Sequence, residues 1–80
     1  MSKLRTLSGK EVIDIFVSLG FAVVNQKGSH VKLRRETDEM RQTLIVPNHS
    51  ELDKGTIRAI YQQACHYLPQ ETLKPLFYTA

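Results

Sequence analysis

The sequence predicts an α+β sandwich in which two amphipathic helices cover one face of a three-stranded antiparallel sheet. Apolar residues recur at helical spacing in two segments, and three short stretches rich in β-forming residues lie between them. The connections between these stretches are too short for parallel crossovers, so the strands form an antiparallel meander. Both helices must bury an apolar stripe, and the sheet offers them one common face.

The first helix is expected over residues 9–19. It opens with a capping box, in which the Ser8 hydroxyl accepts the backbone N–H of Glu11 and the Glu11 carboxylate reaches back. Apolar residues follow at near-helical spacing, and Gly20 fits a left-handed position just after the helix.

The second helix is expected over residues 54–65, with either Ser50 or Asp53 as its cap. Its apolar stripe consists of Ile57, Ile60, Tyr61 and Ala64. A last short helix is expected over residues 70–73, because Pro75 prevents it from being long and regular.

The three strands are expected over residues 21–26, 29–35 and 41–46. In the second of them Val31 and Leu33 alternate with polar residues, which indicates one buried and one exposed face. The resulting order is that of a double-stranded-RNA-binding-like α-β-β-β-α sandwich with a short C-terminal helix. The 80 residues make one domain, over positions 1–80.

Composition excludes several classes of protein. Hydrophobic residues make up 41% of the chain and charged residues 24%, which is ordinary for a globular protein and argues against disorder. No apolar run is long enough to span a bilayer, so no membrane partner is expected. The single cysteine, Cys65, cannot form an internal disulfide, and no signal peptide opens the sequence. The expected location is the cytoplasm.

The charge is unevenly distributed. Residues 1–35 hold seven lysines and arginines against two acids, a net charge of +5, whereas residues 36–80 carry a net charge of −2. A basic half suggests an anionic partner such as nucleic acid, although a solvated basic face is the alternative.

The main candidate for chemistry is His30. Strand alternation places it with Lys32 and Arg34 on the face of the sheet away from the helices. The turn Lys27-Gly28-Ser29 can add backbone N–H groups, since glycine lets a phosphate come close. Histidine is the side-chain type best suited to proton transfer at neutral pH, and beside cations it suits RNA cleavage through the 2′-hydroxyl. The alternative is a hairpin with an exposed polar face.

A second candidate is Lys54-Gly55-Thr56, because the start of a helix can hold a phosphate; an ordinary helix cap is the alternative. His49 either assists from a loop beyond the third strand or is simply solvated. His66 is interpreted as structural, at the end of the second helix. Cys65 and His66 point about 100° apart on a helix, and no second pair exists at zinc spacing, so no metal site is expected.

Five segments together resemble the HicA family, also called YcfA-like, over residues 4–74. They are Leu7-Ser8-Gly9-Lys10-Glu11-Val12-Ile13, Leu19-Gly20-Phe21, Gln26-Lys27-Gly28-Ser29-His30, Val46-Pro47-Asn48-His49 and Lys54-Gly55-Thr56-Ile57-Arg58-Ala59-Ile60. The resemblance implies an mRNA interferase, the toxin of a type II toxin–antitoxin pair, which cleaves mRNA without a metal or other cofactor. It also implies neutralisation by a HicB antitoxin.

The resemblance assigns the catalytic role to His30, in the same Gly-Ser-His setting, and maps the family's Val-Pro-x-His segment onto Val46 to His49. The chain departs from the family pattern where Cys65-His66-Tyr67 replaces a glycine and where Pro75 interrupts the tail. Two other functions remain open: a non-catalytic RNA-binding module of the same fold and a protein-interaction domain. An RNA binder should carry a dense lysine cluster at the start of its last main helix, which is missing here.

Overall fold

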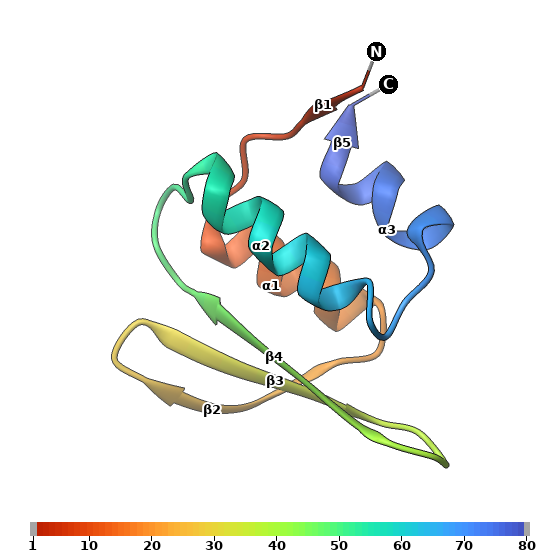
Figure 1. The fold of residues 1–80 in the computed structure, drawn as a ribbon. Coiled ribbons are helices and arrows are strands. Elements are labelled where there is room, and N and C mark those ends of the chain that lie inside the picture. Colours follow the sequence, from red (N-terminus) through yellow and green to blue (C-terminus); the bar gives the residue numbers. More distant parts are fainter. Residues whose placement is uncertain (1, 80) are drawn as a thin grey trace.

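The computed structural model describes residues 2–79 and confirms the predicted α+β class. Its elements are β1 (Lys3–Leu4), α1 (Gly9–Ser18), β2 (Ala22–Lys27), β3 (His30–Glu36), β4 (Arg41–Pro47), α2 (Lys54–Ala64), α3 (Gln70–Phe77) and β5 (Tyr78–Thr79). Figure 1 shows the sheet β2-β3-β4 with α1 and α2 over one of its faces and α3 beyond them. This is the expected double-stranded-RNA-binding-like arrangement. The two end positions of the predicted domain, Met1 and Ala80, lie outside the described residues.

The start of α1 follows the predicted capping box. Ser8 Oγ accepts a hydrogen bond from the Glu11 N–H at 3.0 Å, and the Ser8 N–H donates to Glu11 Oε1 at 2.9 Å. The bond from the Ser8 backbone lowers the pKa of the Glu11 carboxyl group, because it stabilises the charged form. The helix ends at Ser18, and Gly20 has a φ of +99°, the left-handed conformation expected there.

The main sheet has β3 at its centre and antiparallel pairs on both sides. In β3 the side chains of Val31 and Leu33 are buried, whereas His30 is exposed, as the period-two pattern predicts. Leu44 and Val46 of β4 are buried beside them, aligned with Leu33 and Val31. This face of the sheet meets α1 and α2, and the opposite face is open.

The hydrophobic core continues from the sheet through the helices to α3. Phe16 and Phe77 are the largest of the fully buried side chains. The ring centroid of Phe77 lies 5.8 Å from that of Phe16 and 5.5 Å from that of Tyr61. Aromatic pairs of this kind add about 0.5–1.5 kcal/mol beyond the area they bury. The C-terminal helix is therefore an integral part of the core.

The length of that helix corrects the prediction. The sequence predicts a helix over residues 70–73, whereas α3 runs eight residues to Phe77 with Pro75 inside it. Proline lacks the N–H that would bond the carbonyl one turn earlier, which costs ~3 kcal/mol in a helix interior. Leu73 and Phe77 lie one turn apart and are fully buried, and the burial of two large side chains stabilises the helix by more than that.

A second, two-stranded sheet joins the ends of the described chain and has no counterpart in the prediction. Lys3 of β1 pairs with Thr79 of β5, and Leu4 pairs with Tyr78. Strands of two residues carry no hydrophobic periodicity, so no sequence pattern reveals them. None of the helices within residues 2–79 is both long and apolar enough to cross a membrane.

Candidate active site

A tight hairpin turn brings His30 to the surface. Lys27, the last residue of β2, pairs directly with His30, the first residue of β3, so Gly28 and Ser29 alone form the turn. Gly28 has a φ of +60° and Ser29 a negative φ, which fits a type II′ turn with glycine at its first central position. A Cβ on Gly28 would meet nothing within 4 Å, so the backbone conformation, not space, requires glycine here.

The predicted cations follow His30 along the open face of the sheet. Lys32 and Arg34 alternate with the buried Val31 and Leu33, and both are half-buried. Lys32 is aligned with Asn25 on one side and Ile45 on the other. The histidine and two cations therefore share one strand face, and Lys27 lies directly across from the histidine.

His49, the auxiliary candidate, lies next to the same turn. Its Nε2 atom is 3.1 Å from the hydroxyl oxygen of Ser29, and the N–H of Asn48 donates to the Ser29 carbonyl. Pro47, just before this segment, is aligned with His30 across β3 and β4. Ser29 thus stands between the two histidines, next to His30 in sequence and within hydrogen-bond distance of His49.

Gly9, at the start of α1, holds this loop in place. Its N–H donates to the carbonyl of His49 at 2.8 Å. A Cβ at this position would lie within 2.8 Å of three backbone atoms, namely Pro47 O, Asn48 Cα and His49 N. Only glycine allows this approach. The sequence does not predict this role for Gly9, because the contact joins segments 40 residues apart, which no local pattern reveals.

A groove with a volume of about 710 Å³ runs from His30 along the free edge of β4 and the flank of α2. One wall contains His30, Ile45 and Pro47 of the sheet, and the other contains Thr56, Gln63 and His66. His66, which the sequence places as a structural residue at the end of the second helix, is exposed and lines this groove. Here β4 contacts α2, which lies over the sheet in Figure 1.

The first residues of α2 are only partly available to a ligand. Asp53 is the cap, since its Oδ1 accepts the Thr56 N–H at 2.7 Å, and this bond lowers the pKa of its carboxyl group. Lys54 Nζ donates to Leu4 O at 2.7 Å and to Thr6 Oγ1 at 3.2 Å. The structure therefore places Thr56 on the groove, whereas Lys54 points to the N-terminal segment and a carboxylate already occupies the helix start.

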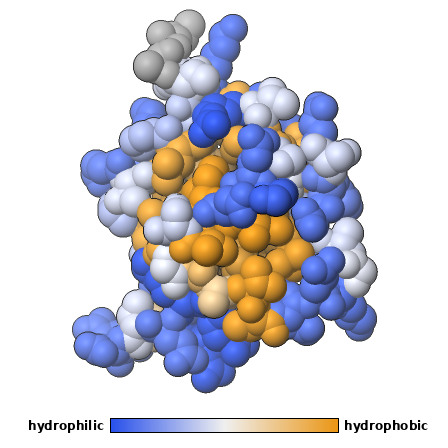
Figure 2. All heavy atoms as spheres, turned by 180° about the vertical axis from the view of Figure 1, so that it is seen from behind, coloured by the Kyte–Doolittle hydropathy of each residue, from blue (hydrophilic) through white to orange (hydrophobic). Residues whose placement is uncertain are grey.

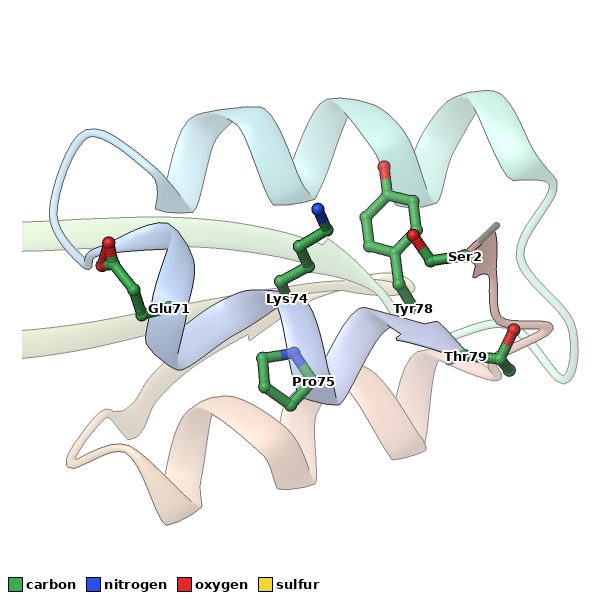
Figure 3. Close-up of a pocket in the computed structure, with 6 residues that line it drawn as sticks. All are labelled: Ser2, Glu71, Lys74, Pro75, Tyr78 and Thr79. Carbon is green, nitrogen blue, oxygen red and sulfur yellow. The ribbon is translucent and has the colours of Figure 1, made fainter.

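Two other surfaces are separate from this groove. A pocket of about 520 Å³ lies where α3 and β5 meet the start of the chain, and Figure 3 shows Lys74 and Tyr78 pointing the same way within it. Figure 2 shows hydrophobic side chains gathered in the middle of the side opposite to that of Figure 1, surrounded by hydrophilic ones.

Within residues 2–79, no three histidine, cysteine, aspartate or glutamate side chains are grouped so that they could hold a metal ion.

The fold and the site define a class of small double-stranded-RNA-binding-like proteins that present a histidine and cations on an open sheet face. The sequence model of the family described as HicA toxin of bacterial toxin-antitoxin matches residues 9–65, from the start of α1 to just beyond α2. This match covers more than half of the chain, which therefore belongs to the HicA toxin family. Comparisons with curated proteins and with solved structures gave no match.

Proposed function

We propose that this HicA-family protein is an endoribonuclease that cleaves mRNA, with His30 as its proton-transfer group. The observation that carries the proposal is the position of His30, exposed at the end of a groove and between a glycine turn and two strand cations. The 2′-hydroxyl of RNA supplies the nucleophile, so the protein needs only a group that moves protons and groups that stabilise negative charge.

The reaction proceeds by transfer within the RNA backbone. A base takes the proton of the 2′-hydroxyl, the 2′-oxygen bonds to phosphorus, and the bond from phosphorus to the 5′-oxygen breaks as that oxygen receives a proton. The products are a 2′,3′-cyclic phosphate and a 5′-hydroxyl. General acid–base help from His30 contributes on the order of 10²–10⁴-fold.

Charge stabilisation comes from the groups around His30. Lys27 and Lys32 lie on either side of it in the hairpin, and the N–H groups of the Gly28–Ser29 turn approach a phosphate without a side chain in the way. His49 acts as an auxiliary group by orienting the Ser29 hydroxyl, 3.1 Å from its Nε2. Arg34 extends the basic strip along the backbone of the RNA.

We also propose that a HicB-like antitoxin silences the protein by covering Lys27–Lys32 and masking His30. A toxin of a toxin–antitoxin system requires such a partner. The hairpin is exposed and basic, so an acidic or phosphate-mimicking surface would compete with RNA for it. An interface confined to residues 73–80, with His30 open to solvent, would contradict this proposal.

The test compares wild type with His30→Ala on a defined RNA and on the same RNA with one 2′-deoxy nucleotide at the cut. We expect wild type to cut in the presence of EDTA and to leave the deoxy-substituted strand intact. The variant should bind RNA without cutting it. RNA binding without cleavage by wild type would instead favour the non-catalytic RNA-binding module, and loss of cleavage on chelation would overturn the metal-independent mechanism.

A further inference from the structure

The groove beside His30 differs chemically from the rest of the protein. The chain carries a net charge of +3, yet no lysine, arginine, aspartate or glutamate is among the described residues that line the groove. Its surface combines apolar side chains with the neutral amides of Gln62 and Gln63, the Thr56 hydroxyl and the imidazoles of His30 and His66. Ile45 is 37% exposed and adds apolar surface to the groove on the side of the sheet.

The two amides are free to recognise a ligand. Both glutamines are exposed on α2, and no hydrogen bond among residues 2–79 engages either side chain. Each side-chain amide offers two donors and an acceptor. Around them Ile60 and Ala59 provide apolar surface on the same helix.

This lining suits a nucleobase better than a phosphate. A phosphate requires cations or clustered N–H groups. The lysines, Arg34 and the turn N–H groups lie on the hairpin and its strand, which the groove meets at its His30 end. A base has apolar faces and polar edges, and single-stranded RNA exposes both. An α-helix rises ~1.5 Å per residue, so the wall from Thr56 to Gln63 is about 10 Å long. Stacked bases are ~3.4 Å apart, so this wall has room for about three of them.

We propose that this groove holds the bases next to the cut, with Gln62 and Gln63 reading their edges, so that it sets the sequence preference of cleavage. The inference rests on the proposed function. The phosphates follow Lys27, Lys32 and Arg34 on the open face of the sheet, while Ile45, aligned with Lys32, marks where the bases enter the groove.

The experiment maps cleavage sites in a randomised RNA pool for wild type, for the double variant Gln62→Ala/Gln63→Ala and for Gln70→Ala. Gln70 is a matched control, because it is an exposed helical glutamine outside the groove. We expect wild type and Gln70→Ala to share one base preference within about three nucleotides of the cut. The double variant should weaken that preference at least about fivefold, the discrimination expected of one good contact to a base edge.

Alanine favours helix at exposed positions, so the double variant should fold, and circular dichroism checks this. An unchanged preference in the folded double variant, or no base preference in wild type, would overturn the base-recognition proposal while leaving the nuclease intact. Absence of RNA cleavage by wild type would instead overturn the proposed function. In the His30→Ala background, equal binding of preferred and disfavoured RNA would also count against base recognition.

Discussion

Replacing Gly9 with alanine tests whether α1 holds the loop that carries His49. At an ordinary helical position this change would stabilise a protein by about 0.4–1 kcal/mol, because it reduces the freedom of the unfolded chain. Here the new Cβ would lie within 2.8 Å of Pro47 O, Asn48 Cα and His49 N. All three are backbone atoms, so they cannot turn aside as the end of a flexible side chain would.

The cost follows from that crowding. Overpacking costs typically 1–3 kcal/mol, and three rigid contacts place Gly9→Ala near the upper end, about 3 kcal/mol. Subtracting the helical gain leaves a net loss of about 2 kcal/mol. For a domain of this size, 2 kcal/mol corresponds to a fall in Tm of roughly 8–16 °C.

The assay is thermal unfolding followed by circular dichroism, with Gly55→Ala as the control. Gly55 is also near a helix start, but its Cβ would meet only Asp53 Oδ1 at 3.4 Å, an ordinary contact, so this variant should melt at or slightly above wild type. If Gly9→Ala melted as high as Gly55→Ala, the loop would be free to move and the reasoning would fail. At temperatures well below its Tm, where the variant is folded, Gly9→Ala should also cleave RNA more slowly than wild type, because the loop carries His49.

Three further outcomes are expected. Phe77→Ala should lower the free energy of unfolding by about 3–5 kcal/mol in a urea titration, and a loss under 1 kcal/mol would show that α3 is dispensable. The pKa of Asp53 lies below its ordinary 3.8, so its hydrogen bond to the helix start contributes stability that is complete above that value and is lost as pH falls through the folded pKa. In urea titrations at decreasing pH, the unfolding midpoint of Asp53→Ser should therefore fall less than that of wild type. Lys32→Ala should reduce the salt slope of RNA affinity by about 0.7, whereas Lys54→Ala, whose ammonium binds the N-terminal segment, should leave it unchanged.

Features that depend on nearby residues were predictable from the sequence. The capping box of Ser8 and Glu11 involves residues three positions apart, and Gly20 follows its helix directly, so propensity and spacing suffice. The exposure of His30 also follows from alternation within one strand. The choice between Ser50 and Asp53 as cap was open, because both can accept an amide, and in the structure Asp53 accepts the Thr56 N–H.

Features that depend on distant contacts were not predictable. The eight-residue α3 contradicts the expected effect of Pro75, because the burial of Leu73 and Phe77 is a property of the assembled core. The groove requires β4 and α2 to lie side by side, so the placement of His66 on its wall could not be seen in the isolated pattern Cys65-His66. The binding of Lys54 to Leu4 likewise joins segments 50 residues apart.

The pairing of Lys3 with Thr79 makes the path of the chain nearly a closed ring. The helices and strands then follow one another around this ring, and their packing depends little on where the ring is opened to form the two chain ends. A short linker from β5 to β1, with new ends in the exposed turn at 37–40, should therefore yield a circular permutant of the same fold. That turn lies at the end of β3 far from His30, so the permutant should keep the cleavage site of the original chain, which sequencing of its RNA products would show.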